Sequence, residues 1–481
     1  MLSSFMFIPL VMLVSFQNLP QNLTKKINLR IARVLFLHGK LTFFMILVCE
    51  AAIVNTDQDI KTPISDNDKP GILWWTGRLF PHFEEDEKII SCPKGQCLST
   101  KLRNKKDDAS TRGFIFYGTD LEIEDMPLPR KSYHQWALMH EESPMNNFLF
   151  SHNIAISLFN YTATFRRESD YPLTTQFIPS ISYLTERKPI PLSVKNQLRK
   201  NGLSAVLYVQ SHCGVASDRD RYVKELSQYI SIDSYGTCLQ NKELPTSLAD
   251  SEMFENEEFY KFISKYKFHL AFENAICDDY MTEKLFRPLH VGSVPIYKGS
   301  HKVKDWIPSD PSVIVVDDFE SPAELAKFIQ YLDENDEEYS RYLKFKSSEG
   351  VTNKLLLEVL FHRPWGVNDP DKIDFIEGFE CFVCDKVLEH LHFEKKKINN
   401  NTTEALLPKM GSKDHMGCPQ PHVSLGTDSN LPATDEWKQY YWVDSFWYAY
   451  DLGRALDAMI RNGENSSSHI HTYAMKMRYR H

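Results

Sequence analysis

Excess positive charge, nucleotide-binding glycine motifs and internal repeats are all absent from this 481-residue sequence. Its 55 Lys and Arg are outnumbered by 64 Asp and Glu, which gives a formal net charge of −9 at pH 7. Such a chain has no general attraction for nucleic acid or for anionic membranes. No GxxxxGK[ST] string is present and no GxGxxG follows an apolar run, which argues against a P-loop and against nicotinamide binding.

Long apolar runs are scarce as well. Residues 1–16 are apolar and uncharged, and residues 41–54 form a second run that contains Glu50. The second run is shorter than the ~20 residues that span a bilayer. Basic residues lie before it, and such residues stay on the cytoplasmic side of a membrane. We therefore expect residues 1–54 to be the targeting and membrane-anchor region of a single-pass type II protein whose bulk is lumenal. The alternative is that one of the two runs is a cleaved signal.

Cysteine occurs nine times, and one of the nine, Cys49, lies in the expected anchor. The other eight are an even number in a lumenal domain, which predicts disulfides whose connectivity the sequence does not give. Cys381 and Cys384 form a CxxC pair. Zinc would need a second pair at suitable spacing, and none is nearby. We predict a local disulfide between these two cysteines, with no redox role.

Apolar runs alternate with polar connections and helical patterns from residue 71 to about residue 390. After a polar stem at 55–70, the first domain is expected at 71–195, with strand-like runs at 71–75, 113–117, 136–140 and 154–160. The second domain is expected at 196–390, with strands at 205–210, 230–235, 268–272, 294–297 and 313–316 and helices at 222–230 and 322–332. This alternation predicts two α/β domains, the second a doubly wound parallel sheet.

The last part of the chain, residues 391–481, has a weaker pattern and is expected to be a partly flexible extension. Residues 395–401 and 411–430 are interpreted as flexible loops because they are polar and carry no apolar period. Residues 435–460 are rich in Trp and Tyr and are helical in part. We expect this segment to pack as a C-terminal helix on the body.

The most informative stretch is 266–299. The apolar run 268–272 predicts a buried strand, a polar loop follows, and Met281, Leu285 and Leu289 recur every four residues, which predicts a helix over 280–291. Asp278 or Asp279 is expected to cap the helix start and Gly292 to end it. With the strand at 294–297 this is a βαβ unit, whose loop lies at the carboxyl edge of the sheet, where ligands bind.

The residues at that edge suit a sugar nucleotide. Lys284 supplies a cation for phosphate, one of the carboxylates could bind ribose or sugar hydroxyls, and a ring could stack. The polar loop and helix start hold Asn274, Asp278, Asp279, Tyr280, Thr282, Glu283 and Lys284. The start of a helix also favours anions. The alternative interpretation is an ordinary surface turn followed by a solvated helix start.

The string FENAICDDYMTEK at 272–284, followed by VGSVPIY at 291–297, closely resembles the signature of the α1,3-fucosyltransferase family, glycosyltransferase family 10. The resemblance extends from about Trp74 to Cys384. It implies the GT-B fold, in which two Rossmann-like domains face each other across a cleft, GDP-fucose as the donor, and inversion at the sugar. The family's usual topology implies a lumenal enzyme of the endoplasmic reticulum or Golgi membrane.

Two further strings, YGTDLEIEDMPLPRK at 117–131 and LFNYTATFRRESDYPLTTQ at 158–176, look like one branch of this family, fucosyltransferases ten and eleven. That branch is regarded as transferring fucose to Ser or Thr of small disulfide-rich extracellular modules. The family's broader activity implies another acceptor, N-acetylglucosamine of an N-glycan.

The resemblance places the catalytic base at Glu142, in the HEESP string that follows the strand at 136–140. The adjacent Glu141 is the alternative base. A carboxylate suits this step because an alcohol becomes acidic as it attacks. A structural alternative is that both are a solvated loop pair.

By the same matching, Arg219 and Lys284 neutralise the leaving diphosphate, and Arg219 stands eight residues after Ser211 as in the family. The alternative for Arg219 is an ion pair with Asp218 or Asp220. His212 departs from the family, which more often has Asn there. Ser211, Asn274, Tyr280 and Glu283 carry over as further donor-binding residues. Arg166 and Arg167 are expected to contact either the acceptor or the other domain.

No metal and no cofactor is expected, because the resemblance implies that basic residues replace the metal. Asp218-Arg219-Asp220 is formally a DxD string, but the Arg within it opposes a cation. A second class of function, a non-catalytic glycan- or protein-binding pseudoenzyme, would show as loss of Glu142, Arg219 or Lys284. All three residues are present.

Overall fold

The computed structural model describes residues 69–248, 256–400, 411 and 416–478. The anchor expected at 1–54 lies outside these residues, as does nearly all of the stem. Within the described part of the chain, no helix has both the length and the apolar content that a membrane span requires.

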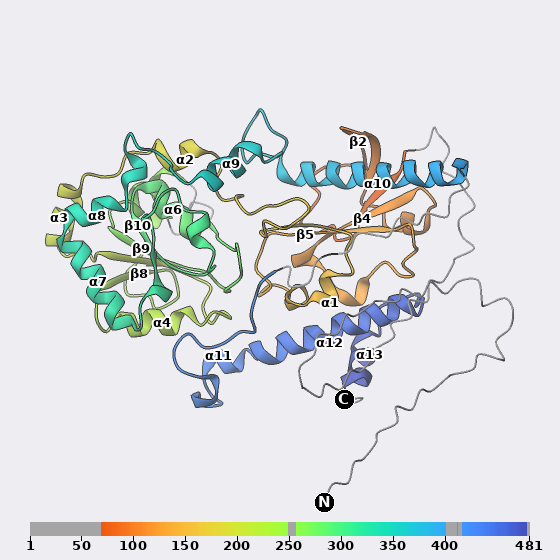
Figure 1. Cartoon of the computed structure of the whole chain (residues 1–481). Coiled ribbons are helices and arrows are strands. Elements are labelled where there is room, and N and C mark those ends of the chain that lie inside the picture. The colour runs from red at the N-terminus through yellow and green to blue at the C-terminus, as the bar shows by residue number, and fades with distance from the viewer. Residues whose placement is uncertain (1–68, 249–255, 401–410, 412–415, 479–481) are drawn as a thin grey trace, which may run out of the picture. The chain divides into compact units, whose positions relative to one another are not determined.

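The first lobe is built on a six-stranded sheet in the order β2-β3-β1-β4-β5-β6, in which only β2 and β3 pair antiparallel (Figure 1). Its strands are β1 Gly71–Trp74, β2 Glu87–Cys92, β3 Gly95–Thr100, β4 Thr111–Tyr117, β5 Gln135–His140 and β6 Tyr161–Thr164. The α-helix of this lobe in the first half of the chain is α1 Asn153–Ile156, and short 3₁₀ segments lie at Arg103–Asp107, Gly118–Asp120, Ile123–Asp125 and Phe148–Ser151.

The strand predicted at 154–160 is wrong. Its first residues form α1, and the strand β6 begins only at Tyr161. Ala155 and Ile156 are buried in the core from a helical turn. A short apolar run fits a buried helix turn as well as a buried strand, so periodicity did not distinguish them.

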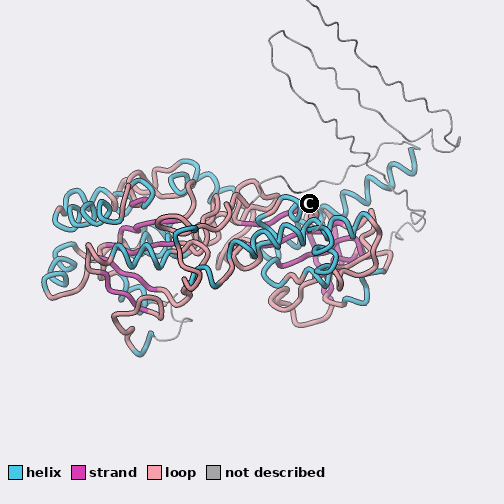
Figure 2. Tube along the Cα trace, turned by 90° about the horizontal axis from the view of Figure 1, so that it is seen from below, coloured by secondary structure: helices cyan, strands magenta, loops and turns pink. Residues whose placement is uncertain are grey.

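The second lobe is built on five parallel strands in the order β11-β10-β9-β7-β8. The strands are β7 Val206–Val209, β8 Ile232–Tyr235, β9 Phe268–Phe272, β10 Val294–Lys298 and β11 Ile314–Val315. The helices are α2 Ile181–Thr185, α3 Leu192–Lys200, α4 Arg219–Leu226, α5 Glu257–Ile263, α6 Glu283–Val291, α7 Pro322–Glu334, α8 Asp336–Arg341 and α9 Lys354–His362. Figure 2 shows the strands of the two lobes as two separate groups.

Alternate residues of the second sheet face different helices. Phe268, Leu270 and Phe272 share one apolar cluster with α4 and α7, whereas Ala271 packs in another with α6. Because successive strand residues point to opposite faces, helices cover both faces of the sheet. The predicted doubly wound arrangement is confirmed.

The signature unit folds largely as predicted. Strand β9 is wholly buried, and Gly292 ends α6 in the left-handed region at φ 71°. The cap, however, is Thr282, whose Oγ1 accepts the N–H of Lys284, and not Asp278 or Asp279. The Asp279 carboxylate is held instead by Arg167 and Trp306, so it is not available to the helix start.

Helix α10, Phe375–Asn400, packs against β2, β3 and β4, so it belongs to the first lobe although residues 196–390 were expected to form the second domain. The local disulfide predicted between Cys381 and Cys384 is wrong. These two cysteines pair with Cys92 and Cys97 instead. Residues three apart share one face of a helix, and that face lies on the β2–β3 hairpin. The helix also includes residues 395–400, which were expected to be a loop.

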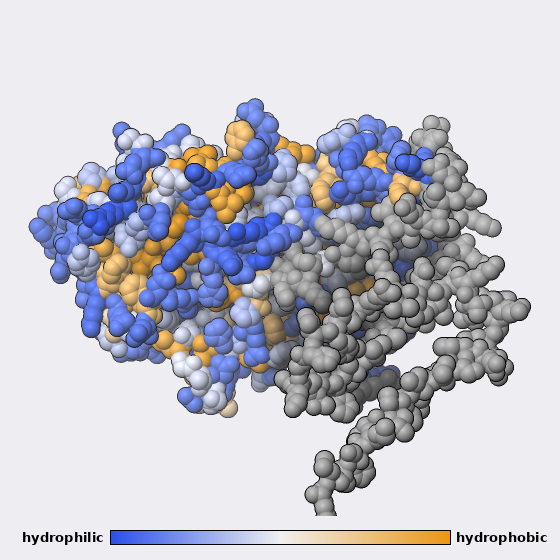
Figure 3. All heavy atoms as spheres, in the orientation of Figure 1, coloured by the Kyte–Doolittle hydropathy of each residue, from blue (hydrophilic) through white to orange (hydrophobic). Residues whose placement is uncertain are grey.

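The C-terminal helices are α11 Glu436–Gln439, α12 Trp442–Arg461 and α13 Ile470–Arg478, which bears out the helical segment predicted at 435–460. Helix α12 packs against α1 and the turn Phe148–Ser151, on the face of the first sheet opposite α10 (Figure 1). Figure 3 shows hydrophilic residues over most of the visible described surface, with narrower apolar areas between them.

Candidate active site

The carboxyl ends of β7 and β9 meet at the place where strand order reverses. The connection from β7 runs to β8 on one side, whereas the connection from its other neighbour, β9, runs to β10 in the opposite direction. Crevices at such a point bind ligands in open α/β sheets. Gln210 follows β7 and Glu273 follows β9, so both lie at this crevice.

Arg219 bridges the two strand ends. Its side chain is buried, with 1% of the residue exposed. The guanidinium donates to the Phe272 carbonyl, to Gln210 Oε1 and to the His212 carbonyl, each at 2.8 Å. All three partners are neutral, and Nε has no hydrogen-bond partner among the described residues. A buried guanidinium bonded only to neutral oxygens retains its charge for an anion.

The alternative role for Arg219, an ion pair with its neighbours in sequence, is not what the structure has. Asp218 accepts from Arg221 Nε at 2.6 Å. Asp220 accepts from the Tyr208 hydroxyl at 2.8 Å. Both carboxylates are therefore engaged by other groups.

The start of α6 gathers three charged side chains around Thr282. Lys284 Nζ lies 3.0 Å from Glu283 Oε1 and 3.7 Å from Glu273 Oε2. Glu273 is fully buried and accepts from the Thr282 amide and hydroxyl, each at 2.8 Å. Burial raises the pKa of Glu273 to about 7. Burial also opposes ionisation of Glu283, but the charges of Lys284 and Arg287 outweigh it and lower its pKa to about 2.

Arg219 and Lys284 lie at the same edge of the sheet. Arg219 bonds to the carbonyl of Phe272, and the next residue is Glu273, the carboxylate beside Lys284. Burial and the Arg219 charge act to lower the pKa of Lys284, while Glu283 and Glu273 raise it above its ordinary value. The structure thus brings together the two cations that the sequence singled out.

Glu142 of the first lobe contacts the loop between β9 and α6, which we call the signature loop. It lies just after β5, and its Oε2 accepts from the Tyr280 hydroxyl at 3.2 Å. Tyr280 is buried, packs on Phe165, and its pKa is raised well above the ordinary range by burial and by Glu142. Tyr280 therefore bonds to the carboxylate from the opposite lobe.

The neighbouring Glu141 has a different environment. Its Oε1 accepts from the Tyr117 hydroxyl at 2.8 Å, within the first lobe. Burial raises the pKa of Glu141 to about 7. The two adjacent carboxylates therefore point to different partners, and only Glu142 bonds to the signature loop.

Asn274 and Ser211 complete the predicted set. The Asn274 carbonyl accepts from the Ser217 amide at 3.1 Å, and its Oδ1 is buried without a hydrogen-bond partner in the described part of the chain. Ser211 is exposed, and its carbonyl accepts from Thr237 Oγ1 at 2.8 Å. Asn274 thus offers an inward acceptor, whereas Ser211 lies at the outer rim.

Arg166 and Arg167 contact the other lobe. Arg167 forms a bidentate pair with the buried Asp279, from Nε to Oδ2 at 2.9 Å and from Nη2 to Oδ1 at 2.5 Å, and also reaches Asp305 at 2.8 Å. Arg166 lies 3.3 Å from Asp278. Of the two roles expected for these arginines, the structure shows the domain contact.

One cluster has the composition of a metal site without being one. Cys213, Cys238 and Asp220 place ligand-type atoms close together. The two sulfurs are joined in a disulfide, so they are not thiolate ligands.

Comparison with known proteins decides the family. Residues 67–175 match the family model "Fucosyltransferase, N-terminal", and residues 199–399 match "Glycosyltransferase family 10 (fucosyltransferase) C-term". The chain belongs to glycosyltransferase family 10.

Relatives within family 10 match most of the chain. GDP-fucose protein O-fucosyltransferase 3 of Danio rerio is 43% identical over 416 residues, covering 85% of this chain and 87% of the relative. The protein of the same name in Gallus gallus is 42% identical and covers 85% and 83%, and that of Homo sapiens is 42% identical and covers 83% and 81%. Among solved structures, an α1,3-fucosyltransferase with GDP matches at 16% identity and a TM-score of 0.37, covering 68% of this chain and 93% of that one.

Sequence reasoning missed two residues of this family-10 site. Gln210 and Glu273 both bond within the crevice, yet neither was singled out. Each is the first polar residue after a buried strand, and that position is the signal that points to them. It also gave the C-terminal segment no part in the site, because residues 416–478 lie beyond the stretch from Trp74 to Cys384 that carries the resemblance.

Proposed function

We propose that this chain transfers fucose from GDP-fucose to a Ser or Thr hydroxyl of a folded, disulfide-containing protein module, with inversion at the anomeric carbon. One arrangement supports the proposal: the cations Arg219 and Lys284 share a sheet edge that Glu142 approaches from the other lobe. The names of the relatives support the donor and the acceptor class. Three retained functional groups at one place argue against a non-catalytic binder.

In the proposed reaction the acceptor oxygen bonds to C1 of fucose while the bond from C1 to the diphosphate oxygen breaks. Glu142 takes the hydroxyl proton. Arg219 and Lys284 stabilise the negative charge that develops on the departing GDP, which is the role a metal plays in other transferases. The reaction is therefore expected to need neither a divalent metal nor a cofactor.

Three residues are proposed to position the donor. Glu283, whose pKa is lowered to about 2, is ionised at neutral pH and accepts from donor hydroxyls. Asn274 offers its buried Oδ1, and Ser211 is proposed to contact the donor from the rim. Tyr280 is proposed to hold Glu142 in place.

The proposed location is the lumen of the endoplasmic reticulum or Golgi, with residues 1–54 as the anchor. The four disulfides support an oxidising compartment.

The test is a transfer assay with GDP-fucose and two acceptor classes: folded disulfide-rich modules of secreted proteins, and an N-glycan with accessible N-acetylglucosamine. We expect the mass of one deoxyhexose on Ser or Thr of a module, with and without EDTA. Transfer to the N-glycan alone would contradict the acceptor, and a requirement for added metal would contradict the mechanism. No transfer and no GDP-fucose hydrolysis would favour the pseudoenzyme.

A further inference from the structure

A segment beyond the matched family ranges crosses between the lobes. We call residues 416–441 the strap. It is fixed to the second lobe by a disulfide and three hydrogen bonds: Cys277–Cys418, Ser424 N to Asp218 Oδ2 at 3.0 Å, Arg221 to Asp435 at 2.8 Å, and Trp437 Nε1 to the Ala216 carbonyl at 3.2 Å. It continues into α12, which packs on the first lobe. The strap is therefore anchored at both ends.

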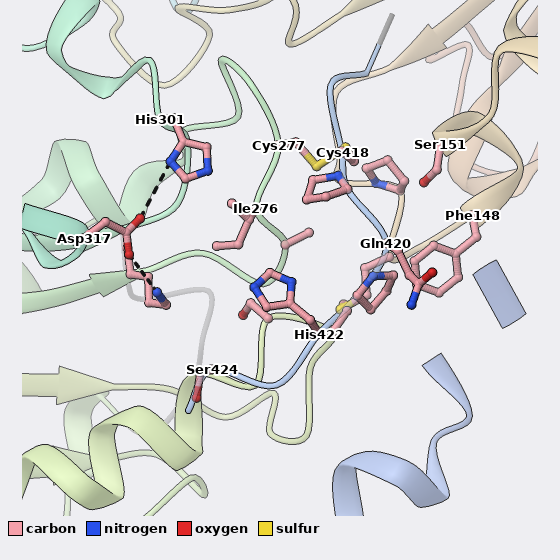
Figure 4. A pocket seen from close by; sticks show the side chains of 18 residues that line it. Phe148, Ser151, Ile276, Cys277, His301, Asp317, Cys418, Gln420, His422 and Ser424 are labelled. Carbon is pink, nitrogen blue, oxygen red and sulfur yellow. Dashed lines mark hydrogen bonds and ion pairs between the residues drawn. A yellow bond between two sulfur atoms is a disulfide. The ribbon is translucent and has the colours of Figure 1, made fainter. Parts of the chain in front are cut away.

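The strap forms one wall of a cavity of about 190 Å³ (Figure 4). Pro144 and Phe148 of the first lobe, Ile276 of the signature loop, and Gln420 and His422 of the strap line this cavity. Figure 4 shows Phe148 beside Gln420, with the Cys277–Cys418 disulfide at the cavity edge. Pro144 stands two residues after the proposed base in the sequence, so the cavity adjoins the catalytic loop.

The cavity is too small for a whole acceptor. Sites that enclose a small molecule usually measure about 300–1,000 Å³. A space of about 190 Å³ fits the tip of a larger molecule, such as one loop of a folded protein. The rest of that molecule must lie outside the cavity, on the surface around its mouth.

The end of the strap and helix α12 together carry four exposed aromatic side chains. Tyr440 is 48% exposed, Tyr441 66%, Trp447 47% and Tyr450 37%. Trp447 Nε1 donates to Gln420 Oε1 at 3.0 Å, which joins this aromatic patch to the cavity wall. The rings of Trp447 and Tyr450, three residues apart on α12, lie 6.2 Å from each other. Trp and Tyr are the residues that dominate protein interfaces, and exposed apolar patches mark them.

We propose that the strap and this aromatic patch are the docking surface for the folded protein acceptor, whose Ser- or Thr-bearing loop enters the cavity towards Glu142. The inference rests on the proposed function and adds the residues that recognise the acceptor. The match to the C-terminal family model ends at residue 399, before the strap begins. Residues outside the part shared by the family could therefore select a protein module over a glycan.

The test uses the full chain, GDP-fucose, and a folded disulfide-rich module that the wild-type enzyme fucosylates. Trp447→Ala, Tyr441→Ala and the combined variant with Tyr450→Ala are compared with Phe361→Ala, which removes a 76% exposed aromatic ring on α9. We expect the combined variant to raise KM for the module at least tenfold. The rate of GDP-fucose hydrolysis and the KM for the donor are expected to stay within twofold of wild type, and the Tm is expected to be unchanged. The control variant is expected to behave in the same way.

A module KM within twofold of wild type in the combined variant would overturn the docking surface while leaving the proposed function intact. An equal loss of hydrolysis and transfer would also overturn it, because the patch would then act on the donor. If the wild-type enzyme fucosylates no module, the proposed function itself fails, and the docking surface fails with it.

Discussion

At the scale of single residues, the site depends on the different hydrogen-bond partners of two adjacent carboxylates. Glu141 bonds to Tyr117 inside the first lobe, while Glu142 bonds to Tyr280 of the second. Both residues follow the end of β5 at His140, and their side chains reach partners in different lobes. Only one of the two can therefore face an acceptor that lies between the lobes.

Replacing each carboxylate by its amide tests this division. Glu142→Gln is expected to lower kcat at least a hundredfold, because a general base contributes about 10²–10⁴. Glu141→Gln is expected to retain transfer within about tenfold. Initial rates at saturating GDP-fucose give both values. A larger loss in Glu141→Gln than in Glu142→Gln would reverse the assignment of the base.

Glu273 and Glu283 predict opposite effects of pH on stability. The pKa of Glu273 is raised to about 7, so its contribution is present below the ordinary value of about 4.5 and is lost as pH rises towards 7. The pKa of Glu283 is lowered to about 2, so its contribution is present above 4.5 and is lost as pH falls towards 2. Glu273→Gln should flatten the fall in Tm between pH 5 and 8.

Glu283→Gln is the comparison variant. Because the Glu283 charge also helps to raise the pKa of Glu273, this variant should flatten the fall less than Glu273→Gln does. Thermal unfolding in a series of buffers at constant ionic strength measures both variants. An unchanged pH profile in Glu273→Gln would show that this carboxylate is ionised throughout the range.

At the scale of elements, α10 is joined twice to the β2–β3 hairpin. The two disulfides close chain loops of 289 and 287 residues, and they lie side by side. With either one intact, the other closes only a short loop. The unfolded chain therefore gains the entropy of the long loop only when both disulfides are removed.

Removing these disulfides singly and together tests the argument. Cys97→Ala/Cys384→Ala is expected to cost about 3 kcal/mol, and adding Cys92→Ala/Cys381→Ala to cost more than twice as much in total. Urea unfolding measures the difference. Cys213→Ala/Cys238→Ala, which opens a loop of 25 residues, is the control. Peptide mapping without reduction should recover the 92–381 and 97–384 pairs, and a 381–384 bridge would contradict the fold.

Sequence reasoning succeeded where the signal is local. It placed β9 at its observed bounds, found Gly292 at the end of α6, and brought Arg219 and Lys284 into one site. It failed where the deciding contact is distant in sequence. Asp279 does not cap α6 because Arg167, in the other lobe, binds it. The two cysteine pairs of α10 join residues 289 and 287 positions apart in the sequence. The strap lies outside the stretch of sequence that resembles the family.

At the scale of the whole molecule, several polar contacts hold the lobes together at the site, among them the pairs of Arg166 with Asp278 and of Arg167 with Asp305. Arg167 binds the buried Asp279 in a bidentate pair, and Tyr280 donates to Glu142. Asp279 is positioned further by Trp306 Nε1 at 2.9 Å. Burial opposes ionisation of Asp279, but the bonds from Arg167 and Trp306 keep its pKa below the ordinary value.

Removing the arginine is expected to be costly. Arg167→Ala removes the bidentate partner of a buried carboxylate and leaves it only the more distant Arg166, at 3.7 Å, as a cation; breaking a buried pair costs about 3–5 kcal/mol. The stability of Arg167→Lys should lie between those of the wild type and Arg167→Ala, because an ammonium cannot form the bidentate pair. Arg187→Ala breaks a pair with the exposed Glu257 and should cost less than about 1 kcal/mol. Chemical unfolding measures the free energy of unfolding of the three variants. Equal losses of stability in Arg167→Ala and Arg187→Ala would contradict the proposed role of the Arg167–Asp279 pair.

The placement of α10 and α12 on opposite faces of the first sheet has a consequence for biosynthesis. Both faces of that sheet are covered by residues from the end of the chain. At about 5–20 residues per second, the 289 residues from Cys92 to Cys381 take roughly 15–60 s to leave the ribosome. We therefore expect the nascent first lobe to expose apolar faces and unpaired thiols while the second lobe is made. In the proposed lumenal location, chaperones and disulfide isomerases would act in that interval.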